Sequence, residues 1–407
     1  MIIHLLPRIQ SKLYKHIQVK TFDDEKGSDE QSVAISNSLS YYLGDIKKQI
    51  CVYEKEWDIY KKYTNPFEYI HTNIPNKKYC VSKIKPISRA YYKMVELIQT
   101  FNLGIDSPHP IRSFHLAEGP GGFIEAVAKL RMCPNDSYIG MTLLDTDNMN
   151  HDPNIPGWKK TEYFLREFTN VKIENGIDGT GNILSFNNFM YIHETYGSSM
   201  DLITADGGFD FSDDFDNQEL NMVPLLYGQI IYALCMQKQG GSFVLKVFDI
   251  FMQQTIDMIA LLSSMYQQVY ITKPNTSRYA NSEKYIVCKG FIHNSSSTFY
   301  THLYNSFQEI CNHKHKIYRI LKIGKISSIF TSKLEEYNVI FGQQQIENIH
   351  STLMLIMSSN EDSYSRNRDN HYNSNSNSAN TRKIIKINIQ KCIQWCLKHK
   401  IGYNYDV

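Results

Sequence analysis

The sequence predicts an α/β fold in which a mostly parallel sheet carries helices on both faces. Apolar runs of strand length recur along the chain, and helical stretches separate several of them. The run Ser242–Phe248 is nearly all apolar, as expected for a strand that is covered on both faces. A glycine-rich turn also joins a strand to a helix within residues 114–127. Such turns present backbone N–H groups and a helix N-terminus to a ligand.

The periodicity of apolar residues places the main elements. Lys83–Phe101 is predicted to be an amphipathic helix, with Pro86 at an early position and apolar residues on one face. Further helices are predicted at Val223–Gln237, Phe251–Met265 and Leu334–Met357. The predicted strands are Phe114–Ala117, Tyr138–Leu143, Leu202–Ala205, Ser242–Phe248, Gln268–Thr272 and Lys284–Lys289.

Shifts in composition divide the chain into five parts. Residues 1–82 are polar and are predicted to form a mainly helical N-terminal extension, and residues 83–330 form the α/β domain. A helical segment follows at 331–359, and then a Ser/Asn-rich tract at 360–380 is predicted to be a disordered linker. Residues 381–407 are predicted to form a helix that docks on this chain or on a partner, through a stripe of Ile389, Cys392, Ile393, Cys396 and Leu397.

The overall charge excludes a polycationic protein. The 407 residues carry a formal net charge of +2, so any surface that binds nucleic acid must be a local patch. The eight cysteines are scattered without a CxxC pair, which favours free thiols in a reducing compartment over disulfides or zinc. The residue types and spacings predict no metal site.

The apolar tracts argue against a targeting or membrane segment. The run at Met1–Leu6 is too short for a signal peptide, and Lys246, Asp249 and Asp257 interrupt the longest apolar tract, 242–266. We therefore expect a soluble intracellular protein that makes no membrane contact.

The glycine turn is the first candidate site. It contains Gly119, Pro120, Gly121 and Gly122 between an apolar run and a helix-like stretch. Glycine suits a place where a ligand approaches the backbone, because a Cβ would hold it away. The alternative is a tight strand-to-helix turn that binds nothing.

Three charged residues follow or interrupt predicted strands. Asp206 ends one strand, Lys246 lies inside the apolar strand Ser242–Phe248, and Glu283 directly precedes the last strand. A lysine buried in a strand costs several kcal/mol unless it is paired or lines a cavity. Taken singly, Asp206 could cap a turn, Lys246 could reach solvent from an edge strand, and Glu283 could be a surface carboxylate.

These residues lie within an ordered set of blocks that resembles the FtsJ-type 2′-O-ribose methyltransferases, and in particular their mRNA-cap branch. The resemblance runs from about Ser88 to Phe291. It implies a Rossmann-like methyltransferase fold that uses S-adenosyl-L-methionine (SAM). The family's Lys-Asp-Lys-Glu tetrad maps onto Lys93, Asp206, Lys246 and Glu283, with every residue type intact. The blocks are Ser88–Met94, Ala117–Phe123, Gly140–Leu143, Gly176–Gly181, Thr204–Gly208, Phe243–Phe248 and Thr276–Cys288.

The resemblance also implies where SAM lies. It places the cofactor over the glycine turn and names Asp178 for the adenine amino group, although a turn aspartate is an equal alternative. The chain departs from the cap branch at Glu118, where that branch more often has a small residue or cysteine, and at Tyr279, where it often has proline. The predicted cofactor residues are Glu118, Gly119, Pro120, Gly121, Gly122, Phe123, Thr142, Asp145, Asp178 and Asp206.

Methyl transfer to a ribose 2′-hydroxyl requires a group that takes up the hydroxyl proton. A lysine serves only if its pKa falls from about 10.4 toward 7, a change of roughly 4 to 5 kcal/mol. Burial and a second ammonium favour that change, whereas a carboxylate opposes it. We therefore predict Lys246 as the base beside Lys93, oriented by Asp206 and Glu283. Because coupled groups titrate together, the sequence leaves open which member takes the proton.

The predicted substrate is the 5′ end of capped mRNA, methylated on the first transcribed nucleotide (cap 0 to cap 1). The alternatives are a 2′-O-methyltransferase of rRNA or tRNA, and a non-catalytic RNA-binding subunit of a capping or polymerase complex. The segment 381–407 could also bind other capping or transcription proteins.

The bias toward Asn, Ile, Lys and Tyr favours a large cytoplasmic DNA virus or a protist as the source of the sequence. A viral protein would be located in the host cytoplasm or in the virion. The predicted RNA contacts are Arg89, Lys273, Ser277, Arg278 and Asn281.

Overall fold

The structure is a computed structural model, and it forms two compact units. It describes residues 1–21, 33–145, 155, 157–208, 218–312, 317–322, 324, 326–366 and 374–404, the side chains of 360–366 and 374–379 excepted. Unit 1 contains residues 1–36, 86–274 and 283–337, and unit 2 contains residues 37–85, 275–282 and 338–407.

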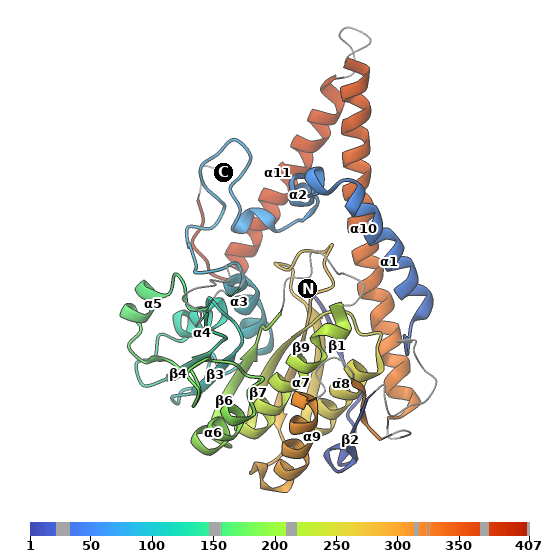
Figure 1. The fold of residues 1–407 in the computed structure, drawn as a ribbon. Coiled ribbons are helices and arrows are strands. Elements are labelled where there is room, and N and C mark those ends of the chain that lie inside the picture. Colours follow the sequence, from blue (N-terminus) through green and yellow to red (C-terminus); the bar gives the residue numbers. More distant parts are fainter. Residues whose placement is uncertain are drawn as a thin grey trace. The chain divides into compact units, whose positions relative to one another are not determined.

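Unit 1 is built on an eight-stranded sheet in the order β1-β8-β9-β7-β6-β3-β4-β5 (Figure 1). Strands β7, β6, β3, β4 and β5 pair in parallel, whereas β9 is antiparallel to both β7 and β8, and β1 is antiparallel to β8. The strands are β1 (Ile2–Leu5), β3 (Arg112–Leu116), β4 (Ser137–Met141), β5 (Val171–Ile173), β6 (Met200–Ala205), β7 (Gln237–Val247), β8 (Tyr266–Lys273) and β9 (Lys284–Phe291).

Helices cover this sheet. Helix α4 packs on β4 and α3, α7 packs on β6 and β7, and α8 packs on β8 and β9. Consecutive residues of β3 and β6 are buried, so both faces of the sheet centre are covered. The described helices are α3 (Ala90–Phe101), α4 (Gly122–Arg131), α5 (Glu162–Glu167), α6 (Phe186–Tyr196), α7 (Gln218–Met236), α8 (Gln253–Met265) and α9 (Tyr300–Asn312), with short 3-10 turns η1 (Leu13–His16) and η4 (Ser296–Thr298). A small second sheet pairs β2 (Ile17–Thr21) with β10 (Ile317–Leu321).

The six predicted strands are confirmed, but two predictions about the first hundred residues need correction. Residues 2–5, assigned to a helical extension, form edge strand β1, because this apolar run pairs with β8. The first helix of unit 1 begins at Ala90 rather than Lys83. The backbone N–H of Lys83 donates to Gly402 O, and that of Ile87 donates to the Glu125 carboxylate. The Ile87 N–H is therefore not available to Lys83 O, the bond that a helix beginning at Lys83 would make.

Unit 2 is helical. It contains α1 (Asn37–Val52), α2 (Glu54–Thr64), the 3-10 turn η3 (Glu68–Ile70), α11 (Ser374–Lys398) and α10 (Ser328–Arg366) from Asn338 onward. Helix α11 packs on α2 and η3, so the C-terminal segment docks on this chain. The buried stripe is rotated from the predicted one, because Leu397 is 57% exposed while Trp395 is 3% exposed. Its members are Asn388, Cys392, Trp395, Cys396 and His399.

The Ser/Asn-rich tract is also more regular than predicted. Helix α10 continues to Arg366 and α11 begins at Ser374, so helical backbone extends into both ends of the proposed linker 360–380. Its middle, residues 367–373, lies outside the described residues. Ser and Asn carry little helix propensity, but they lie here on the ends of two long helices. In the part of the chain that the structure describes, no helix combines the length and apolar character needed to cross a membrane.

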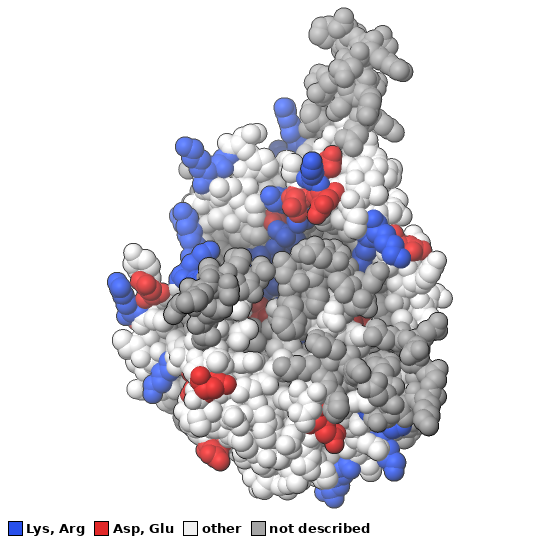
Figure 2. Space-filling model, in the orientation of Figure 1, with Lys and Arg blue, Asp and Glu red and all other residues white. Residues whose placement is uncertain are grey.

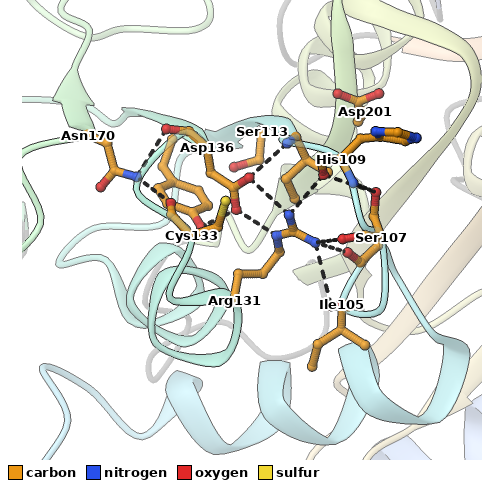
Figure 3. Close-up of polar contacts among 12 residues, drawn as sticks. Ile105, Ser107, His109, Ser113, Arg131, Cys133, Asp136, Asn170 and Asp201 are labelled. Carbon is orange, nitrogen blue, oxygen red and sulfur yellow. Dashed lines mark hydrogen bonds and ion pairs between the residues drawn. The ribbon is translucent and has the colours of Figure 1, made fainter.

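A buried arginine fixes the amino-terminal edge of the sheet (Figure 3). The Nε of Arg131 donates to Asp136 at 2.6 Å, its Nη2 donates to the second Asp136 oxygen at 3.0 Å, and its Nη1 donates to backbone carbonyls in the loop 104–107. Asp136 also accepts from the N–H of Ile111 and the hydroxyl of Tyr138. This cluster ties the end of α4 to the starts of β3 and β4.

Replacing Arg131 with lysine is expected to lower the free energy of unfolding by about 3 kcal/mol. An ammonium cannot reproduce the two-pronged contact with Asp136, and the carbonyls lose donors in a buried place. Urea denaturation followed by circular dichroism measures the loss. Arg166→Lys, on the exposed face of α5, is the control and should change stability by less than about 0.5 kcal/mol. Equal stability of the two variants would contradict the role assigned to this cluster.

Candidate functional site

The candidate site lies at the carboxyl ends of the central strands of unit 1. Strand β3 ends at Leu116 and leads into the glycine turn, β6 ends at Ala205 directly before Asp206, and β7 carries Lys246 next to its last residue. From β3 the parallel strands continue to β4 on one side and to β6 on the other. Open α/β sheets bind their ligands at such a switch point.

The structure brings the four predicted tetrad residues together as two ion pairs. The Lys93 Nζ lies 2.8 Å from the Glu283 Oε2. The Lys246 Nζ donates to the backbone oxygen of Asp206 at 2.6 Å and lies 3.4 Å from its Oδ1. All four residues belong to unit 1, on α3, the β6 end, β7 and the residue before β9.

Tyr285 joins these two pairs and was missed from the sequence. Its hydroxyl donates to Asp206 Oδ1 at 2.9 Å and accepts from Lys93 Nζ at 3.4 Å. The signal was available, because residues two apart on a strand point to the same side and Tyr285 stands two places after Glu283. The cluster is therefore a connected network of five side chains.

Burial strengthens the interactions within this network. Lys93 is 6% exposed and Glu283 is 7% exposed. Burial alone raises the pKa of the Glu283 carboxyl, but the ammonium groups of Lys93 and Lys246 outweigh it and hold that pKa well below its ordinary value. Burial, and then the carboxylates of Asp206 and Glu283, raise the pKa of the Tyr285 hydroxyl. Glu283 is thus anionic, and Tyr285 is a neutral hydrogen-bond donor.

The glycine turn is packed by the chain itself. A Cβ on Gly122 would lie 2.3 Å from the Ser88 Oγ and 2.9 Å from the Tyr91 backbone N. A Cβ on Gly119 would lie 2.5 Å from the Gly157 carbonyl oxygen. Gly121 adopts φ +107°, a conformation that favours glycine, at the N-terminus of α4. Close packing against the chain therefore requires glycine at these positions, whatever else the turn binds.

Glu118 directly precedes this turn in the sequence. One oxygen of its carboxyl group has hydrogen-bond partners, and the other has none among the described residues. Its Oε1 accepts from Thr204 at 2.7 Å and lies 2.8 Å from His115 Nδ1. Its Oε2 is buried and has no hydrogen-bond partner among the described residues. Burial raises the pKa of Glu118 despite the nearby His115, and the charge of Asp206 adds to that rise. A buried acceptor without a donor, beside a glycine turn, is the mark of a ligand contact.

The turn 176–181 lies beside the end of β4. The Leu144 N–H donates to Thr180 O, and a Cβ on Gly181 would lie 1.9 Å from Thr142 O. Thr142 is buried and its hydroxyl accepts from the Gly119 N–H, whereas Asp145 is half-buried.

Asp178 is exposed and organises this turn. Its Oδ1 accepts from the N–H and hydroxyl of Thr180 and from Asn188, and these hydrogen bonds, against slight burial, lower its pKa to about 2. The contacts of Asp178 are thus those of an aspartate that stabilises a turn, the alternative given above. Its contact with the adenine amino group stays a prediction. Pro120 lies in the turn, and Phe123 is buried in the first turn of α4.

Trp158 is a second residue that sequence reasoning missed. A Cβ on Gly140 would lie 2.3 Å from its ring, and one on Gly121 would lie 3.1 Å from it. Its indole Nε1 is buried and has no partner among the described residues. Two glycines of different motif blocks therefore make room for one aromatic ring, a relation that spacing along the chain does not reveal.

The five predicted RNA contacts lie in different environments. Lys273 is buried, and its ammonium donates to the backbone oxygen of Glu283 at 2.8 Å, which corrects its assignment to RNA. Ser277 is fully buried, and the Arg278 guanidinium makes a two-pronged contact with Glu68 inside unit 2. Arg89 is half-buried before α3 and Asn281 is exposed, and for these two the RNA contact stays a prediction.

Lys273 gives the protein an expected pH dependence. Burial, and next the Lys284 ammonium, lower the pKa of Lys273 well below its ordinary value. As the pH rises toward about 10.4, the folded chain therefore loses this proton before the unfolded chain does, so this group makes the free energy of unfolding rise with pH over that range. Urea denaturation between pH 7 and 9.5 should show wild type gaining stability relative to Lys273→Met as pH rises. A constant difference between the two proteins would contradict this.

The described residues contain no group of three or more His, Cys, Asp or Glu arranged to hold a metal ion. The site is instead a set of ammonium, carboxylate and hydroxyl groups beside a glycine turn.

Comparison with known proteins agrees with this arrangement. The family model described as FtsJ-like methyltransferase matches residues 86–291. Among curated proteins, the chain is 30% identical over 256 residues to cap-specific mRNA (nucleoside-2′-O-)-methyltransferase 2 of Danio rerio, covering 62% of this chain and 34% of that protein. It is 30% identical over 250 residues to the methyltransferase 1 of Trypanosoma brucei brucei, covering 59% of this chain and 63% of that protein.

A solved structure of a putative ribosomal RNA methyltransferase from Plasmodium falciparum is 23% identical, with a TM-score of 0.35, and the match covers 50% of this chain and 98% of that one. The chain spans less than two thirds of the curated relatives described above. The family match covers half of the chain, including the four residues of the predicted tetrad, and this chain therefore belongs to the FtsJ-like methyltransferase family.

Proposed function

We propose that this protein methylates the ribose 2′-hydroxyl of the first transcribed nucleotide of capped mRNA, with SAM as the methyl donor. The observation that carries the proposal is a connected network at the carboxyl edge of the sheet, in which Lys93, Glu283 and Tyr285 are buried and Asp206 and Lys246 are half-buried. Similarity to relatives named as cap-specific mRNA 2′-O-methyltransferases supports the substrate class.

The residues beside the glycine turn fit SAM. The cofactor carries an ammonium and a sulfonium, and the unpartnered Oε2 of Glu118 offers a buried acceptor for a cation. The helix N-terminus at Gly122 and the unpartnered indole N–H of Trp158 offer donors for a carboxylate or a ring nitrogen. When bound, SAM supplies a methyl group on a positively charged sulfur.

The proposed role of the tetrad is to accept the proton of the ribose 2′-hydroxyl and to stabilise the positive charge that this proton brings. Lys246 is held at a fixed position by the carbonyl and carboxylate of Asp206, so its nitrogen stays at the edge of the sheet. Glu283 holds Lys93, and Tyr285 connects that pair to Asp206. The hydroxyl O–H bond breaks and its proton bonds to this coupled set, with Lys246, in its neutral amine form, as the proposed acceptor, and the carboxylates stabilise the ammonium that forms.

An assay with SAM and three RNA preparations tests the proposal. Transfer to capped RNA, and not to the same RNA without a cap, is the expected result. Transfer to uncapped structured RNA would identify an enzyme of rRNA or tRNA instead. Binding of RNA without transfer would identify a non-catalytic subunit and would contradict the proposal.

Replacing Glu118 with glutamine is expected to weaken SAM binding by tenfold or more. The amide keeps an oxygen for Thr204 but puts an N–H₂ group where the unpartnered carboxylate oxygen now lies, which repels a cation. Isothermal titration calorimetry measures the affinity. Glu194→Gln, at an exposed glutamate on α6, is the control. Equal affinity of wild type and Glu118→Gln would remove Glu118 from the cofactor site.

A further inference from the structure

Two segments of unit 2 carry charge of one sign only. Residues 69–85 and 381–404 together contain ten of the 43 Lys and Arg and none of the 41 Asp and Glu. The remainder of the chain therefore has 33 basic residues against 41 acidic ones and is net negative. An overall charge of +2 conceals this separation.

The structure joins these two segments. The Lys83 N–H donates to Gly402 O at 2.8 Å, and the Asn404 N–H donates to Val81 O at 2.9 Å. The Asn404 side-chain amide donates to Cys80 O, and Ser82 and Tyr403 form an isolated antiparallel bridge. We call the resulting set of cations the basic surface. It comprises Lys77, Lys78, Lys83, Lys85, Arg382, Lys383, Lys386, Lys391, Lys398 and Lys400.

Most of these side chains face solvent. Helix α11 buries Cys392, Trp395 and Cys396 against α2 and η3, which leaves its cations on the opposite side. Lys85, Lys398 and Lys400 are exposed, and none of the three forms an ion pair with a described residue. In Figure 2 the coloured side chains around the position of the C label of Figure 1 are Lys or Arg, without acidic ones among them.

Helix α2 of the same unit shows the more common arrangement, in which lysines are interspersed with acidic residues. Its lysines alternate with Glu54, Glu56 and Asp58, and Lys61 pairs with Asp58. Charges of both signs neutralise such a face, whereas the basic surface keeps a field that attracts polyanions. Lysine ammonium groups contact phosphates as point charges, and phosphate contacts carry no sequence information.

We propose that the basic surface binds the phosphate backbone of single-stranded RNA without sequence preference. The identity of that RNA as the transcript being methylated rests on the proposed function. The binding itself rests only on the charge separation, and it requires no cap.

The test measures binding of a short, uncapped single-stranded RNA to the full chain by fluorescence anisotropy between 50 and 200 mM salt. The variant is Lys85→Gln/Lys398→Gln/Lys400→Gln, and the matched control is Lys47→Gln/Lys48→Gln/Lys55→Gln on α1 and α2. Each phosphate contact contributes about 0.7 to the slope of log K against log salt for single strands. In the variant, the magnitude of that slope should therefore fall by about 2 and the RNA affinity by at least tenfold. In the control, the slope should stay within a few tenths of a unit of wild type and the affinity within about twofold.

Three results distinguish the proposals. Loss of RNA binding in the variant supports the basic surface. If wild type also transfers no methyl group to capped RNA, that second result contradicts only the proposed function. Equal RNA affinity of variant and wild type, at equal thermal stability, overturns the basic surface. Retained RNA affinity with loss of binding to polyglutamate would assign the surface to an acidic protein and would also overturn it.

Discussion

Replacing Lys246 with alanine is expected to reduce methyl transfer by 10² to 10⁴-fold while SAM binds within a few-fold of wild type. A positioned proton acceptor contributes a factor of this size. Lys246 is 12% exposed by its side chain, and it contacts Asp206 rather than the glycine turn or Glu118. Lys246 is not itself a predicted cofactor residue, and Asp206 stays in place in the variant, so the substitution takes away the proposed acceptor and leaves every predicted cofactor residue. Single-turnover assays with capped RNA, together with calorimetry for SAM, measure the two effects separately.

Strand β7 supplies a matched control. Lys238 lies on the same strand, but it pairs with Asp201 at the opposite end and its side chain is 57% exposed. Lys238→Ala should leave both transfer and SAM binding unchanged. If Lys246→Ala kept a tenth of the wild-type turnover, Lys246 would not be an essential catalytic group. Lys246→Met separates lost chemistry from lost packing, because its side chain keeps most of the volume beside Phe248.

Gly122→Ala is expected to lower the melting temperature strongly and to abolish SAM binding. Its added methyl would lie 2.9 Å from the Tyr91 backbone N and 3.0 Å from the Ala90 Cβ, so α4 must move away from the start of α3. Overpacking of this kind costs about 1–3 kcal/mol and sometimes more. The same shift would displace the glycine turn that begins α4 and Lys93 on α3. Differential scanning calorimetry with and without SAM measures both effects.

Gly402→Ala is the control for this substitution. A Cβ at Gly402 would meet Lys83 at 3.8 Å, an ordinary contact, and the residue lies in unit 2. Its melting temperature should change by no more than about 2 °C, as for a surface substitution. A Gly122→Ala protein as stable as Gly402→Ala would show that α3 and α4 can separate at no cost.

The fold of unit 1 was largely predictable because most of its strands can be recognised from a few consecutive residues. A buried strand such as Ser242–Phe248 reads as an apolar run wherever it lies in a sheet, and the structure places it in β7. Ile2–Leu5 was not recognisable in this way, because a four-residue edge strand is defined by its pairing with β8. The start of α3 was likewise misplaced, since the Ile87 N–H donates to the distant Glu125 carboxylate and not to Lys83 O.

The site was predictable in its residue types but not in its connections. The resemblance supplied Lys93, Asp206, Lys246 and Glu283, and the structure pairs them as Lys93 with Glu283 and Lys246 with Asp206. The spacing of Tyr285 from Glu283 placed it on the same side of the strand, but only the structure shows that its hydroxyl links the two pairs. Similarly, Lys273 looked like an accessible cation for RNA, but it is buried against the Glu283 carbonyl, in a strand that pairs with the next strand β9 and with the distant strand β1.

The sequence by itself determined the α/β class, the central strands, the glycine turn and the four charged residues, because each is written in a few consecutive residues. Only the tertiary structure decided which charges pair, that α11 buries Trp395 rather than Leu397, and that residues 69–85 join 381–404 in one basic surface. The physical reason is that an interaction between groups far apart in the chain depends on their separation in space. The pattern of neighbours along the sequence does not contain that distance.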